Sequence, residues 1–219
     1  MVLGALGDIH KDWPSVRCIM DRHPDIPAWL CVGDLGDDDG AYEDVPAPVY
    51  WIKGNNESFD ALAGGNLPAN LRHILNGTAV DVHGVSVGGV GGTFAPTWYD
   101  TDPAALPHPR KGTMKATVLA DKRRHFVKRE LEALERLGRL DILLTHEAPR
   151  PFRVGRMDAG KTPINELIAA LQPRLHLFGH HHRFAEQDLR GTRSICLDLV
   201  GRSYLLLDTN TWEYEKRDT

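Results

Sequence analysis

The chain has 219 residues, of which 42% are hydrophobic and 26% charged, and this size suits a single domain, residues 1–219, with a substantial core. A formal charge of -4 excludes a general attraction to nucleic acid or anionic membranes, although it leaves room for a local basic patch. The longest apolar runs fall far below the roughly 20 residues of a transmembrane helix, and the N-terminus lacks a signal-like pattern. We therefore expect a cytoplasmic protein without a membrane partner, and the oligomeric state stays open.

Short apolar runs of strand length recur along the chain, and each is closed by Gly or a polar residue. In chain order they are VLGALGDIH (2–10), AWLCVGD (28–34), VYWIKGN (49–55), VSVGGVGG (85–92), LDILLTH (140–146), LHLFGHHH (175–182), RSICLDL (193–199) and SYLLLD (203–208). Between them we expect helices over Pro14–Arg22 after the cap Asp12, over Leu119–Leu137, and over Ile164–Leu171 after the cap Thr162. Strands that alternate with helices predict a layered α/β domain with a mixed sheet.

The segment GRMDAGKT (155–162) fits the phosphate-loop pattern G-x-x-x-x-G-K-[ST]. That pattern needs a strand running directly into its first Gly, whereas a stretch with Pro149 and Pro151 intervenes here. The interpretation we favour is an ordinary loop at Gly160 that leads into the helix capped by Thr162.

Metal-capable side chains follow several of the apolar runs. They are Asp8, His10, Asp34, Asn55, His146, His180 and His182. On an extended backbone, residues two apart point to the same side, so Asp8 with His10 and His180 with His182 can meet one ion or two adjacent ions. All these ligands offer nitrogen or oxygen and none offers sulfur. Such a set suits two divalent ions, with manganese favoured and iron, zinc, nickel or cobalt as alternatives.

Five ordered blocks strengthen this prediction. They read GDIH (7–10), GDLGD (33–37), GNNE (54–57), THEAP (145–149) and GHHH (179–182). In this order they resemble the calcineurin-like metallophosphoesterases, whose pattern is D-x-H, G-D-x-x-D, G-N-H-[DE], a strand-end His and G-H-x-H. The resemblance implies a four-layer α-β-β-α sandwich with mixed sheets and two metals at the strand ends.

The resemblance also implies a role for each ligand. One metal would take Asp8, His10, Asp34 and His182, and the other Asp34, Asn55, His146 and His180, so that Asp34 bridges the two. It further implies that His181 points away from the metals and that Asp37 orients a ligand histidine.

Two such ions lower the pKa of a bridging water, so that hydroxide is available to attack phosphorus. In the family the His of G-N-H-[DE] protonates the leaving oxygen, but this chain carries Asn56 there, whose amide cannot act as a general acid. Phosphodiesters with good leaving groups suffer least from that loss, so we expect a phosphodiesterase acting on cyclic nucleotides or nucleic acid. An acid relocated to His108, Lys111 or another loop residue, a phosphomonoesterase acting on protein or nucleotides, and a non-catalytic metal-binding scaffold remain alternatives.

The long segment over residues 93–117 contains four prolines, and a loop of this length near an active site is usually functional. Trp98 and Tyr99 in this loop are candidates to stack on a base, or to pack beneath the loop. Arg110 and Lys111 open a basic stretch that would guide RNA, or that belongs to a solvated face. The order of motifs also resembles RNA lariat debranching enzymes, which usually place Cys where this chain has Asp8 and His where it has Asn56.

Overall fold

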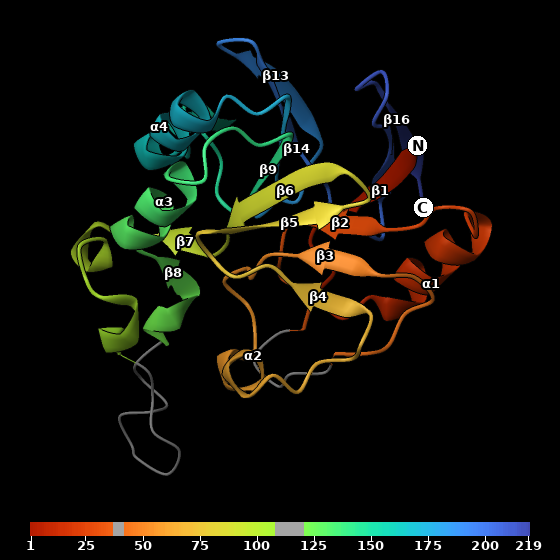
Figure 1. Ribbon diagram of the computed structural model, residues 1–219, viewed down its shortest axis with the longest axis horizontal. Coiled ribbons are helices and arrows are strands. Elements are labelled where there is room, and N and C mark those ends of the chain that lie inside the picture. The colour runs from red at the N-terminus through yellow and green to blue at the C-terminus, as the bar shows by residue number, and fades with distance from the viewer. Residues whose placement is uncertain (37–41, 108–120) are drawn as a thin grey trace.

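The computed structural model describes residues 1–36, 42–107 and 121–219, and it contains two stacked six-stranded sheets (Figure 1). The first sheet has the order β16-β15-β1-β2-β3-β4, with β1 (Val2–Leu6), β2 (Trp29–Cys31), β3 (Val49–Trp51), β4 (Leu71–His73), β15 (Ser203–Asp208) and β16 (Tyr214–Asp218). The second has the order β13-β14-β12-β9-β6-β5, with β5 (Thr78–Val82), β6 (Val85–Val90), β9 (Ile142–Thr145), β12 (Leu175–Phe178), β13 (Ala185–Leu189) and β14 (Thr192–Cys196). Two short ladders pair β7 (Thr93–Phe94) with β8 (His125–Phe126) and β10 (Arg153–Val154) with β11 (Met157–Asp158).

Three buried clusters explain how the layers pack. Between the sheets, Leu30 and Ile52 of the first meet Leu144 and Leu177 of the second. The outer face of the first sheet is covered by α1 (Trp13–Arg22), and that of the second by α3 (Lys128–Glu135) and α4 (Thr162–Leu171). The expected α-β-β-α sandwich with mixed sheets is therefore confirmed, and all eight apolar runs contain strands.

The helices begin where local hydrogen bonds dictate. The Asp12 carboxylate accepts from Ser15 N at 3.2 Å and caps α1, as its sequence predicts. Ser58 caps the short α2 (Phe59–Gly64) in the same way. Lys161, rather than Thr162, is the N-cap of α4.

The helix expected over residues 119–137 is much shorter than predicted. It begins at Lys128, because the Glu130 carboxylate accepts from Val127 N at 2.9 Å and fixes the start there. The preceding residues form a 3-10 turn, η4 (Lys122–Arg124), and then β8, whose Phe126 is buried in the outer core. Likewise, the described part of the segment 93–117 holds β7 and two 3-10 turns, η1 (Pro96–Trp98) and η2 (Pro103–Ala105).

The phosphate-loop-like segment forms a hairpin. Gly155 turns the chain between β10 and β11 with a φ of +60°. Gly160 lies so close to Pro149 that an added Cβ would be 2.4 Å from the Pro149 carbonyl oxygen. The segment therefore lacks the strand of a main sheet that a phosphate loop requires.

The parallel strands decide where the loops meet. Strands β1, β2, β3 and β4 run parallel, as do β6, β9, β12 and β14, and antiparallel strands flank both groups. The carboxyl ends of parallel strands share one edge of a sheet, which is where ligands bind in open α/β sheets.

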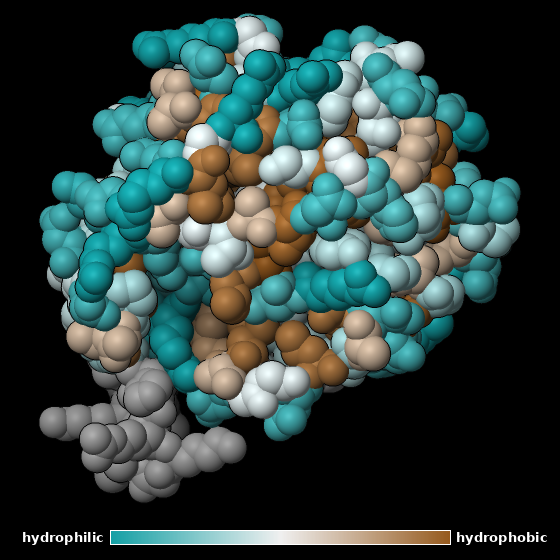
Figure 2. Space-filling model, in the orientation of Figure 1, coloured by the Kyte–Doolittle hydropathy of each residue, from teal (hydrophilic) through white to brown (hydrophobic). Residues whose placement is uncertain are grey.

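On the face shown in Figure 2, hydrophilic residues cover most of the surface and hydrophobic residues appear mainly over its middle. Among the described residues, no helix is long and apolar enough to cross a membrane.

Candidate metal centre

The loops after five strands bring all seven predicted ligand residues to one place. The loop after β1 carries Asp8 and His10, and the loops after β2 and β3 carry Asp34 and Asn55. From the second sheet, β9 leads into His146, and β12 leads into His180 and His182. Their donor atoms form two groups that share Asp34, namely Asp8 with His10, Asp34 and His182, and Asp34 with His146 and His180.

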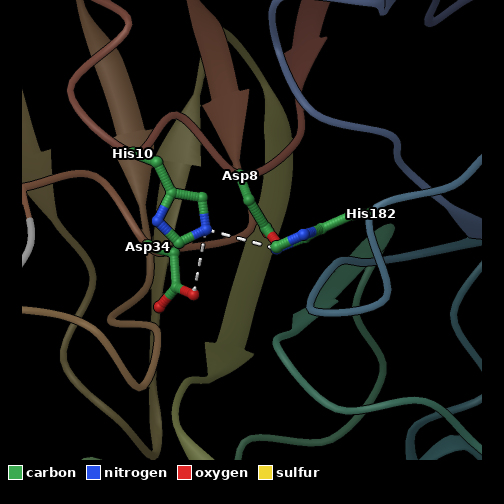
Figure 3. A group of neighbouring side chains, drawn as sticks. All are labelled: Asp8, His10, Asp34 and His182. Atoms are coloured by element: carbon green, nitrogen blue, oxygen red, sulfur yellow. Dashed lines mark hydrogen bonds and ion pairs between the residues drawn. The ribbon is translucent and has the colours of Figure 1, made fainter.

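Figure 3 shows the first group, whose four side chains come together from the loops after β1, β2 and β12. His10 Nε2 is 3.6 Å from Asp34 Oδ2 and 3.2 Å from His182 Nε2. His182 Nε2 is in turn 3.2 Å from Asp8 Oδ2. Both carboxylates are buried while the two imidazoles are partly exposed, so this group faces solvent on its histidine side.

The second group is deeper. The donor atoms of Asp34, His146 and His180 lie within 4.8 Å of one another. His146 Nδ1 donates to Val32 O at 2.8 Å, which leaves Nε2 as the free donor atom for a metal. That Nε2 is 3.0 Å from Asn55 Oδ1 and 3.6 Å from Asp34 Oδ1. Asn55 therefore belongs to this group in space, as its motif implies.

Asp34 presents one oxygen to each group. Its Oδ1 faces His146 and its Oδ2 faces His10, each at 3.6 Å. This is the orientation that a carboxylate needs to bridge two cations.

Four of the candidate ligands have a left-handed backbone. The φ angles are +45° for His10, +53° for Asp34, +69° for His180 and +49° for His182. Non-glycine residues adopt this region at an energetic cost, and such residues gather at functional sites. The turn explains why His180 and His182, although two apart, reach different groups.

Burial and neighbouring charges shift the pKa values of the candidate ligands. Burial by itself raises the pKa of Asp34, but the nearby His146 and the hydrogen bonds from Asn56 outweigh it and hold that pKa below its usual value. Burial likewise lowers the pKa of His146, but Asp34 and Asp8 raise it above the ordinary value. Burial lowers the pKa of His180 to about 4, so this imidazole is neutral and ready to bind a metal.

Several features fit a cation at this place. Asp8 Oδ1 is buried and has no hydrogen-bond partner among the described residues, although Oδ2 accepts from His180 N at 2.9 Å. A buried carboxylate oxygen without a partner is unfavourable, and a bound cation would satisfy it. An added Cβ at Gly54 would lie 1.9 Å from Asp34 Oδ1, and one at Gly179 would lie 2.3 Å from Asp8 Oδ1. The two glycines thus leave room for the carboxylates.

Asn56 and Glu57 hold the loops that carry Asp34. The backbone and side-chain amides of Asn56 each donate to the Asp34 carboxylate at 2.8 Å, one to each oxygen. Glu57 accepts from three backbone amides, including Gly54 N, and from the Tyr42 hydroxyl. Sequence reasoning gave Glu57 no role, although its place in GNNE was the available signal.

A buried hydrogen-bonded chain lies behind His146. The Thr145 hydroxyl donates to Glu147 O at 2.7 Å, so it must accept from His176 Nε2, at 2.8 Å. His176 Nδ1 then accepts from the Ser194 hydroxyl, also at 2.8 Å. This series of hydrogen bonds links β14, β12 and β9, and it holds Thr145, the residue before His146, in place. Thr145 belongs to the THEAP block, but His176 and Ser194 belong to no motif, so the sequence did not indicate these two residues.

The other predicted site residues have different surroundings. The His181 ring packs on Phe152 with ring centres 4.7 Å apart and is in neither donor group. Tyr99 packs on Phe94 and Phe126. Lys122 Nζ lies 6.0 Å from the centre of the Trp98 ring. Four other candidates lie outside the described residues, so their roles stay predictions: Asp37, His108, Arg110 and Lys111.

The fold and the donor cluster together suit a metal-dependent hydrolase, and the comparisons with known proteins identify its family. The chain belongs to the calcineurin-like phosphoesterase family, because the model of that family matches residues 1–184. This family is metal-dependent and acts on phosphoesters.

Individual relatives are distant. An uncharacterized protein of Haemophilus influenzae is 26% identical over 83% of both chains. A lariat debranching enzyme of Drosophila melanogaster is 26% identical over 63% of this chain, which spans 29% of that enzyme's length. The crystal structure of TT1561 of Thermus thermophilus has a TM-score of 0.68 at 17% identity, and the match covers 98% of that chain and 99% of this one, so it shows a shared fold.

Proposed function

We propose that this chain is a phosphodiesterase that works with two divalent ions, with manganese favoured over iron, zinc, nickel or cobalt. The observation that carries the diester preference is the Asn56 side-chain amide, which donates to Asp34 Oδ2 at 2.8 Å. An amide releases no proton at a working pH. The position at which the family resemblance implies a proton-donating histidine therefore holds a group that orients a carboxylate instead.

When bound, divalent ions lower the pKa of a coordinated water and neutralise charge on phosphoryl oxygens. Asp34 would bridge the two ions, with Asp8, His10 and His182 completing one set and Asn55, His146 and His180 the other. The two Asn56 hydrogen bonds keep the Asp34 carboxylate from rotating, so each oxygen stays directed at its own group.

The leaving group then decides which substrates react. General acid catalysis typically contributes about 10² to 10⁴ in rate, and a site without it loses most on esters that expel an unstabilised alkoxide. Diesters with a stabilised leaving group, and strained cyclic phosphates, need less help. We infer that the substrate is a phosphodiester of a cyclic nucleotide or a nucleic acid. The similarity to a protein named lariat debranching enzyme supports a nucleic-acid diester.

A substrate panel tests the reaction type. Purified protein with manganese is assayed on an aryl diester, an aryl monoester, 2′,3′-cyclic nucleotides and short RNA. We expect the aryl diester and at least one nucleotide diester to react faster than the monoester. A monoester preference would favour a phosphatase, and no turnover with metals bound would favour a scaffold.

Two variants at one position test the role of Asn56. Asn56→Ala removes the side-chain hydrogen bond to Asp34, keeps the backbone one and adds no acid. The value of kcat/KM should therefore fall for both aryl substrates. Asn56→His removes the same bond but adds a group with a pKa near neutrality. Relative to Asn56→Ala, it should raise the hydrolysis of an unactivated monoester much more than that of an aryl diester. Equal changes for both substrates, with equal metal content, would remove the basis of the diester preference.

Metal analysis tests the ligand assignment separately from activity. Asp34→Asn removes the carboxylate shared by both groups, so we expect weaker metal binding at both positions and loss of turnover. His181→Ala is the control, because its ring packs on Phe152 outside the donor groups, and it should keep its metals and most of its activity. Two ions still fully bound to the Asp34→Asn variant would contradict the bridging role.

A further inference from the structure

A cleft of about 700 Å³ lies at the end of the second sheet opposite to the candidate metal centre. It is lined by the C-terminal part of α4, the β13–β14 turn and Trp212. Arg174 directly precedes β12 and Thr192 begins β14, whereas His180 and His182 follow the carboxyl end of β12. The length of β12, at about 3.3 Å per residue, thus separates this cleft from the metal ligands by more than roughly 13 Å.

Three arginines line the cleft, and two of them have no charged partner among the described residues. Arg174 Nε is 3.4 Å from Asp141 Oδ1, and its guanidinium carbon lies 5.0 Å from the centre of the Trp212 ring. Arg139 and Arg190 have no side-chain hydrogen bond or ion pair with any residue in the described part of the chain. None of the described residues that line this cleft is acidic.

The three arginines carry more positive charge than Asp141 and the C-terminus of α4 can neutralise. The C-terminus of α4 carries roughly half a negative charge, and Asp141 carries one. Three guanidiniums therefore leave an excess of about 1.5 positive charges, in a chain whose formal charge is -4. Glu166 and Asp188 do not line the cleft. They line an adjoining cavity of about 490 Å³ that shares Arg190 with it, and neither carboxylate forms an ion pair with Arg190 among the described residues.

We propose that this cleft binds a polyphosphate anion, either free or as the phosphate chain of a nucleotide. Guanidinium groups bind phosphate oxygens in pairs, and several of them on one cleft suit a ligand with several phosphates. The cleft volume falls within the usual range for small-molecule sites, about 300 to 1,000 Å³. Binding here does not depend on the proposed phosphodiesterase activity.

The test follows the indole N–H signal of Trp212 by NMR in the 219-residue protein loaded with zinc, because zinc is diamagnetic and does not broaden the signal. The signal is assigned by its loss in Trp212→Phe. Inorganic tripolyphosphate and ATP are titrated separately in excess magnesium, so that metal chelation by the ligand does not strip the protein. We expect a saturable shift with both, and a tighter response to ATP alone would show that the nucleoside is bound as well.

Matched double variants assign the binding. Arg139→Gln combined with Arg190→Gln should weaken the tripolyphosphate affinity about tenfold or more, since two charge-assisted contacts are lost. Arg22→Gln combined with Arg136→Gln removes the same charge from exposed sites outside the cleft and should stay within about twofold of wild type. No shift of the Trp212 signal, or an equal weakening in both double variants, would overturn the proposal.

Discussion

His176 should make the protein less stable in mild acid. Its ring is fully buried between Thr145 and Ser194, and burial lowers its pKa to about 3 from an ordinary 6.5. Between these two pKa values, the histidine is protonated in the unfolded chain but stays neutral in the folded protein. Stability is then lost as the pH falls below the unfolded pKa of 6.5, and the loss continues down to the folded pKa of about 3.

The expected size follows from these two pKa values. Between pH 7 and pH 5 the unfolded histidine becomes almost fully protonated while the folded one stays neutral. The free energy of unfolding should fall by about 2 kcal/mol over this interval from His176 alone. A folded pKa one unit higher hardly changes this figure, because pH 5 still lies above it.

The assay is urea unfolding of wild type and His176→Gln at pH 7 and pH 5, with a chelator present to exclude metal uptake. Glutamine keeps an N–H donor for Thr145 and an acceptor for Ser194, but it cannot titrate. Although this variant starts less stable, its loss between the two pH values should be about 2 kcal/mol smaller than that of wild type. His83→Gln, at an exposed turn, controls for the removal of one histidine. An unchanged pH dependence in His176→Gln would refute the reasoning.

The ligand residues were predictable because parallel strands deliver their following residues to one edge of a sheet. The backbone conformation of these ligand residues was not predictable. An extended exit would place His180 and His182 on one side, but their φ angles of +69° and +49° send them to different groups. Histidine adopts a positive φ more often than most residues, but still uncommonly, so the local sequence does not fix this conformation and tertiary packing must impose it.

The remaining differences also come from long-range contacts. Phe126 and Val127 are apolar at a spacing that extends the helix pattern, yet Phe126 pairs with Phe94 in a short ladder and the helix starts later. His176 lies 31 residues from Thr145 and 18 from Ser194, so their hydrogen bonds are invisible in the sequence. Periodicity and strand-end residues predict layers and ligands, whereas partners distant in the chain need the fold.

Two further substitutions test how the Asp34 loop is held. Glu57→Gln replaces an acceptor with an amide that faces donors such as Gly54 N and the Tyr42 hydroxyl, so urea unfolding should show a loss of about 3 kcal/mol. In Gly54→Ala the new Cβ would lie 1.9 Å from Asp34 Oδ1, which forces the carboxylate to move. Metal titration should therefore show binding about 10- to 100-fold weaker, as is typical when the support of a ligand is disturbed. Gly64→Ala is the matched control, because its Cβ in α2 would have its nearest neighbour at 3.5 Å, and it should bind metal like wild type. If Gly54→Ala also binds like wild type, the close approach of these two loops does not position Asp34.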